Sequence, residues 1–121
     1  MTQMLRATLL VFLLPIPGLA AAHAFPERSR PRVGATLHAS PPLVRIWFDA
    51  GLEGLFCHLT VKTPAGATVS RGRARVAAHS RDRLLEVAIP PLAPGKYRVD
   101  WSVIAVDGHH TEGHYSFRIK P

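Results

Sequence analysis

The residues of this chain best suited to chemistry are a carboxylate and an imidazole two positions apart, in the sequence Asp107-Gly108-His109. Side chains at positions i and i+2 of an extended segment project to the same side, and Gly108 eases the backbone between them. An aspartate and a histidine placed in this way can share one metal ion. The D-x-H spacing is common by chance, so a further donor is needed before it predicts a metal site.

That further donor is His23, which follows Ala20-Ala21-Ala22. The preceding residues are typical of an export signal, because Arg6 precedes an apolar run, Pro15 and Pro17 break it, and small residues end it. The apolar run is shorter than the roughly 20 residues that a membrane span needs. We therefore predict a cleaved signal peptide over residues 1–22 and a single mature domain over residues 23–121.

Cleavage after Ala22 would give His23 a free α-amine, a group whose pKa is about 7.7–8.0 in model peptides and which loses its proton readily to a metal. The amine and Nδ1 of His23 can chelate one ion, His109 supplies a third nitrogen, and Asp107 supplies an oxygen. Tetragonal nitrogen and oxygen ligation is what Cu(II) prefers, whereas Zn(II) favours a tetrahedron. The alternative is that His23 only begins a frayed terminus.

The composition of the mature part indicates one small exported domain with an excess of basic residues. Removing residues 1–22 from the 121 leaves 99 residues, enough for one core. Of the 15 Lys and Arg residues only Arg6 is lost, so 14 remain against 8 acidic residues, a net charge of +6. Export and the lack of interleaved aromatic residues argue against nucleic acid. A solvated basic face is the simplest interpretation, and attraction to anionic lipid or to an acidic partner is the weaker one.

The only cysteine is Cys57, so no disulfide can form within the chain. It is in phase with Leu59 and Val61 in an alternating run, which predicts a buried, apolar role. A copper thiolate is the alternative.

The rest of the mature chain alternates in the manner of β-strands. Four runs point their apolar residues to one side, at Val44–Phe48, Leu85–Ile89, Tyr97–Val103 and Tyr115–Ile119. Turn residues separate the runs, and no helical period is convincing. The irregular segment 70–80 is expected to be a loop or a weak edge strand. The pattern predicts an all-β, Greek-key β-sandwich or barrel of the immunoglobulin-like kind, with about seven strands.

Several motifs together resemble the CopC family of periplasmic copper-binding proteins. They are His23 after the signal, Pro31-Arg32-Val33-Gly34-Ala35-Thr36-Leu37, the strand ending Trp47-Phe48-Asp49, Leu92-Ala93-Pro94-Gly95-Lys96-Tyr97-Arg98-Val99-Asp100-Trp101, Asp107-Gly108-His109, and Gly113-His114-Tyr115-Ser116-Phe117. The resemblance runs nearly end to end. It implies a periplasmic location and a Greek-key β-barrel or sandwich, in agreement with the strand pattern.

The resemblance also implies a site for one Cu(II) ion per chain, made by His23, Asp107 and His109. Asp49 stands where some relatives carry a glutamate near the copper, so it is expected in a supporting or axial role. His110 replaces a common proline, and could add a donor or a supporting contact. Some relatives hold Cu(I) in a methionine-rich loop, but the only methionines here are Met1 and Met4. We therefore expect no thioether Cu(I) site in the mature chain.

Three functions compete on the sequence alone. The leading one is a monomeric, non-enzymatic copper buffer or carrier, which the resemblance connects with an inner-membrane copper transporter of the CopD type. The second is a small copper mono-oxygenase, because a histidine brace also serves enzymes that cleave polysaccharides, although the chain lacks a broad aromatic platform for a glycan. The third is a sandwich domain for protein contacts, in which His23 and the D-G-H motif have no role.

Overall fold

The computed structural model describes Val11, Leu14, Pro15 and residues 23–121. Apart from those three residues, the predicted signal peptide lies outside the described part, and its cleavage stays a prediction. Within that part of the chain, no helix is long and apolar enough to cross a membrane.

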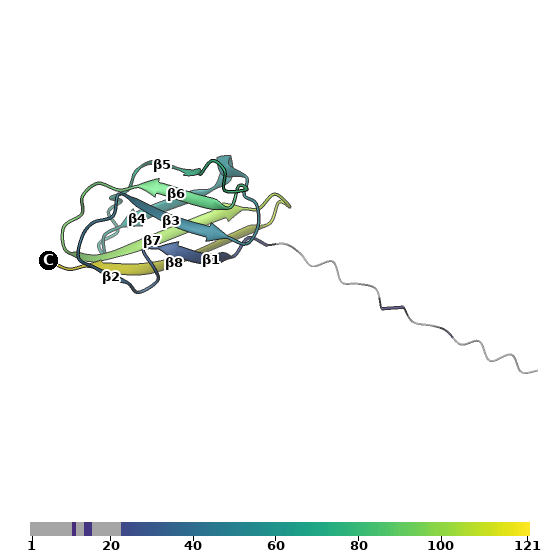
Figure 1. Ribbon diagram of the computed structural model, residues 1–121, viewed down its shortest axis with the longest axis horizontal. Helices are drawn as coiled ribbons and strands as arrows, with labels where there is room; N and C mark the ends of the chain where they lie inside the picture. The colour runs from purple at the N-terminus through teal and green to yellow at the C-terminus, as the bar shows by residue number, and fades with distance from the viewer. Residues whose placement is uncertain (1–10, 12–13, 16–22) are drawn as a thin grey trace, which may run out of the picture.

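Residues 23–121 fold into two four-stranded sheets packed face to face, which confirms the predicted all-β sandwich (Figure 1). One sheet has the order β1-β3-β6-β5 and the other β2-β8-β7-β4. The strands are β1 (Pro26–Arg30), β2 (Thr36–Leu37), β3 (Leu43–Phe48), β4 (His58–Lys62), β5 (Arg71–Val76), β6 (Leu84–Ala88), β7 (Gly95–Ile104) and β8 (His110–Ile119). The only helical turn in the described residues is η1 (Gly54–Phe56).

Every predicted apolar run forms a strand whose alternate side chains fill the space between the sheets. The largest fully buried side chains come from both sheets: Val44, Ile46, Phe48, Leu59, Val61, Leu85, Val87, Val99, Val103 and Phe117. Cys57 is buried among them, as predicted. Because successive side chains of a strand point to opposite faces, the residues between them form the two outer faces of the sandwich.

Two strands of the fold were not predicted. They are β1, which reads Pro-Glu-Arg-Ser-Arg and shows no apolar alternation, and β2, which has only two residues. The irregular segment 70–80 contains β5, which is the edge strand that was one of the two expectations.

A further difference from the expectation concerns the polar stretch before the last strand. β8 begins at His110, five residues before the apolar run at Tyr115. The inward positions of these first residues are Thr111 and Gly113, which give no apolar signal. Gly113 leaves room for the indole of Trp101, since a Cβ at position 113 would lie 2.6 Å from Cζ2 of that ring. Trp101 in turn packs edge-on against Phe48 of the other sheet, with ring centroids 5.3 Å apart.

Candidate metal centre

The Asp107 and His109 side chains are held together by the tight loop that joins β7 to β8. The Ala105 N–H donates to the His109 carbonyl at 2.9 Å, and the Gly108 N–H donates to the Ala105 carbonyl at 2.8 Å. Gly108 has a φ of 86°, in the left-handed region where a glycine is favoured. The loop is therefore a tight turn that brings the residues on either side of Gly108 close together.

The carboxylate of Asp107 is bound through both of its oxygens to a single residue. Its Oδ1 accepts a hydrogen bond from the His109 backbone N–H at 3.0 Å, and its Oδ2 lies 3.0 Å from His109 Nδ1. The pKa of Asp107 is lowered, first because the His109 amide donates to it and then because of the His109 side chain and the charge of His23, against a smaller opposing effect of desolvation. The ionised carboxylate is therefore the favoured form at this site.

The segment that leads into β1 is fixed to both sheets. Ala24 is fully buried, and its carbonyl accepts a hydrogen bond from the Thr111 hydroxyl of β8 at 2.6 Å. The next residue, Phe25, donates its N–H to Asp49 Oδ1 at 2.7 Å and accepts from the Asp49 N–H at 3.0 Å. Asp49 directly follows β3, so one contact comes from each sheet. The hydrogen bonds of Ala24 and Phe25, the two residues that follow His23, therefore fix its position.

These two anchored segments meet at one end of the sandwich, the end opposite the C-terminus in Figure 1. The imidazoles of His23 and His109 lie edge to face, with centroids 4.4 Å apart and planes at 87°. One possible ligand atom from each of His23, Asp107 and His109 lies within 4.8 Å of the other two. Of the described residues, these are the only three histidine, cysteine or acidic side chains that converge in this way.

The converging atoms are nitrogen and carboxylate oxygen, which suit a borderline divalent ion better than a soft one. The His109 side chain is 54% exposed and that of Asp107 is 29% exposed, so the site is open on one side. Phe25, also exposed, lies beside His23 with ring centroids 6.0 Å apart. An ion held here would be accessible to the ligands of another molecule.

The two residues expected in supporting roles take different positions. The Asp49 carboxylate accepts the hydrogen bond of the Phe25 amide, so it fixes the backbone that carries His23. His110 points to the outer face of the β2-β8-β7-β4 sheet, where its Nε2 lies 2.7 Å from Ser102 Oγ and 3.9 Å from Glu112 Oε2. His110 is the first residue of β8, whereas His109 belongs to the loop before it, and the two side chains have different hydrogen-bond partners.

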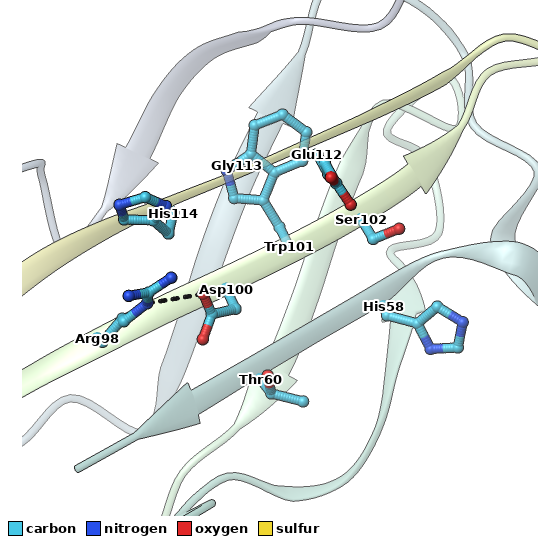
Figure 2. Close-up of a pocket in the computed structure, with 9 residues that line it drawn as sticks. All are labelled: His58, Thr60, Arg98, Asp100, Trp101, Ser102, Glu112, Gly113 and His114. Atoms are coloured by element: carbon cyan, nitrogen blue, oxygen red, sulfur yellow. Dashed lines mark hydrogen bonds and ion pairs between the residues drawn. The ribbon is translucent and has the colours of Figure 1, made fainter. Parts of the chain in front are cut away.

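The other histidines and the cysteine lie away from the three donors. His58 and His114 line a shallow hollow of about 460 Å³ on the outer face of β4, β7 and β8, beside the Arg98–Asp100 ion pair (Figure 2). His38 and His79 are exposed. The Cys57 thiol donates to the Glu53 carbonyl at 3.3 Å, and its pKa is raised, chiefly by burial. Burial thus disfavours the thiolate that copper would need.

Sequence reasoning missed Thr111, one of the two residues that position His23. It occupies an inward position of β8 in phase with Tyr115 and Phe117. A hydroxyl on an otherwise apolar face has to find a partner, and here that partner is the carbonyl of Ala24. The sequence does show one polar residue at a position that alternates in register with buried apolar residues. No neighbouring residue, however, identifies its hydrogen-bond partner.

Comparison with known proteins places the chain among copper proteins. The CopC domain family model matches residues 26–120. Protein YobA of Escherichia coli strain K12 is 32% identical over 99 residues, covering 82% of this chain and 80% of that protein.

Two solved structures share the fold. One is CopC from Methylosinus trichosporium OB3b, with a TM-score of 0.72, 30% identity, and coverage of 82% of this chain and 95% of that one. The other is PcoC from Escherichia coli, a methionine-rich copper resistance protein, with a TM-score of 0.67, 26% identity, and coverage of 82% and 100%.

Proposed function

Because this chain belongs to the CopC domain family, whose members bind copper and are not enzymes, we propose that it is a periplasmic protein that buffers or delivers Cu(II). It holds one ion per chain, at the end of the sandwich where β7 turns into β8. The copper is cargo, taken up and passed on without chemical turnover.

The proposed ligands are the α-amine and imidazole of His23, the carboxylate of Asp107 and the imidazole of His109. The observation that carries this assignment is the convergence of one ligand atom from each of the three residues within 4.8 Å. Signal cleavage after Ala22 would add the amine as a further nitrogen on the residue that is already in place. Three nitrogens and one oxygen match the tetragonal preference of Cu(II).

The proposal specifies Cu(II) rather than Cu(I) because the domain offers no soft thioether. The chain's two methionines, Met1 and Met4, both precede residue 23. PcoC, which shares the fold, is a methionine-rich protein, so this chain and PcoC differ in their methionine content. The buried thiol of Cys57, with its raised pKa, does not substitute for a thioether loop.

Delivery requires that an acceptor reach the ion, and the geometry of the site favours this. His109 is about half exposed, so ligands of a second protein can approach the copper from outside while Asp107 and His23 still hold it. An inner-membrane copper transporter of the CopD type is the partner we propose.

The experiment that tests this function is a Cu(II) titration followed by electron paramagnetic resonance on two preparations that differ by one residue. One begins at His23, and the other keeps Ala22 in front of it, so that the α-amine is moved away while every side chain remains. We expect one tightly bound ion with a nitrogen-rich tetragonal spectrum only in the first preparation. Tight binding with the same spectrum in both would contradict the amine ligand.

Side-chain variants complete the test. His109→Ala and Asp107→Asn should each lower Cu(II) affinity by more than the 10–100-fold typical of residues that only support a metal ligand. His79→Ala is the matched control, because His79 is exposed and lies outside the site. An equal effect of His79→Ala would place the copper elsewhere among the histidines.

A further inference from the structure

The outer face of the β1-β3-β6-β5 sheet carries an array of arginines. The strand registers define three rows across this face, since Leu43, Arg45 and Trp47 of β3 point away from the core. The rows are Arg28–Trp47–Leu84, Arg30–Arg45–Glu86–Arg75, and Leu43–Ala88–Arg71. Five guanidinium groups and one carboxylate therefore occupy the same side of one sheet.

The single carboxylate of these rows cannot neutralise the face. Glu86 has only 8% of its side chain exposed and is shared by two arginines, with Arg45 Nε at 3.3 Å and Arg75 Nε at 3.2 Å from its two oxygens. Arg75 nevertheless keeps 77% of its side chain exposed, and Arg45 keeps 42%. Counted over the three rows, five positive charges against one negative charge leave +4.

The one aromatic side chain of the face is not available for stacking with a base. The guanidinium of Arg28 lies over the Trp47 ring, 4.2 Å from its centroid. This cation–π contact holds the charge flat against the sheet. Single-stranded nucleic acid is bound by exposed aromatic faces between basic residues, so this arrangement does not favour it.

The opposite outer face has a different character. Its basic residues include two lysines, and both Lys62 and Arg98 pair with Asp100, at 3.6 and 2.8 Å. It is also hollowed and lined by histidines and a second carboxylate, as Figure 2 shows. The arginine array is thus a property of one face and does not merely reflect the net charge of the chain.

We propose that the arginine face of the β1-β3-β6-β5 sheet lies against an anionic phospholipid surface. A guanidinium binds a phosphate through two parallel hydrogen bonds, which lysine cannot do. A sheet presents its arginines in a plane, which matches a plane of lipid phosphates better than one compact anion. The copper site stands at the end of this face, past the row of Arg28 and Trp47, so it stays accessible. The proposal goes beyond the copper function and does not depend on it.

The test is co-sedimentation of the chain beginning at His23, which contains every strand and every core residue described above, with vesicles of phosphatidylglycerol and phosphatidylcholine. We expect binding to the mixed vesicles, none to pure phosphatidylcholine, and a loss of binding as salt shortens the range of the charges. Each basic residue near such a surface contributes about fivefold to partition. Arg30→Gln with Arg71→Gln should therefore weaken binding about 25-fold.

The matched control removes the same charge from the other sheet. Lys96 and Arg118 are exposed register partners on β7 and β8, so Lys96→Gln with Arg118→Gln should change binding much less. An unchanged circular dichroism spectrum shows that both variants fold. Equal weakening by the two double substitutions would show that vesicle binding depends only on the net charge of the chain, and it would overturn the proposal. Absence of vesicle binding, with Arg30- and Arg71-dependent binding to polyglutamate instead, would assign the face to an acidic protein.

Discussion

At the scale of single residues, the proposed metal centre depends on groups that are not among its proposed ligands. The hydroxyl of Thr111 donates to the carbonyl of Ala24, 87 positions away in the sequence. The carboxylate of Asp49 accepts a hydrogen bond from the backbone N–H of Phe25. Both hydrogen bonds fix the backbone that follows His23. Thr111 and Asp49 are therefore positioning residues for this proposed copper ligand.

Replacing Thr111 by valine tests this positioning role. The variant keeps the shape of the side chain but leaves the Ala24 carbonyl without its donor, so we expect a loss of about 1–3 kcal/mol in the free energy of unfolding. We also expect weaker Cu(II) binding, because His23 is no longer fixed. Urea denaturation and a copper titration measure the two effects. Thr111→Ser, which keeps the hydroxyl, is the control and should retain both properties; full copper affinity in the valine variant would contradict the role.

At the scale of elements, the β7–β8 hairpin both supplies Asp107 and His109 and completes the core beneath them. Gly113 of β8 faces Trp101 of β7 across the ladder, and the indole lies where a side chain at position 113 would be. Trp101 also contacts Phe48 of the other sheet. The glycine is therefore required by packing, in contrast to Gly108, which is required by its φ of 86°.

Gly113→Ala should destabilise the protein. An alanine in place of glycine ordinarily stabilises by about 0.4–1 kcal/mol where the backbone allows it, but here the new Cβ would lie 2.6 Å from the Trp101 ring. Overpacking of this kind costs about 1–3 kcal/mol, and urea denaturation measures it. In a Trp101→Phe background the smaller ring should reduce the cost. A stabilising effect of Gly113→Ala in the unaltered background would show that the indole can move away freely.

At the scale of the whole molecule, both sheets support the proposed metal centre, but their outer faces differ. Contacts from both of them fix the segment before β1, and their shared end carries the proposed copper ligands. The outer faces then differ, one being an arginine array and the other a mixed surface with histidines and carboxylates. The proposed copper site and the proposed lipid contact therefore lie on different surfaces and can be tested independently.

The pH dependence of copper binding follows from the whole donor set. We expect Cu(II) affinity to fall steeply between about pH 7 and pH 5, because protons compete with the metal for an amine and two imidazoles. The pKa of Asp107 is lowered, chiefly by the His109 amide, so its carboxylate stays ionised throughout that range. Titrations at several pH values measure the profile.

Protonation of Asp107 acts in the same direction as protonation of the nitrogen donors, but it occurs below pH 5 because the pKa of this carboxyl group is lowered. A carboxyl group whose pKa is lowered by folding stabilises the native state above its unfolded pKa, and that contribution disappears as the pH falls through the lowered value. Asp107→Asn should therefore leave the fall between pH 7 and pH 5 in place while lowering affinity at every pH. A flat profile in the unaltered protein would indicate other ligands.

The sequence by itself determined the sandwich fold, the main strands, the burial of Cys57 and the three candidate donors. These depend on local information, because alternation with a period of two shows which face of a strand is buried and residue type shows which atoms can bind a metal. Only the tertiary structure decided that His23 meets the D-G-H loop, that His110 turns away from it and that five arginines share one face. Those results depend on strand register and on hydrogen bonds between residues far apart in the chain, which no local pattern encodes.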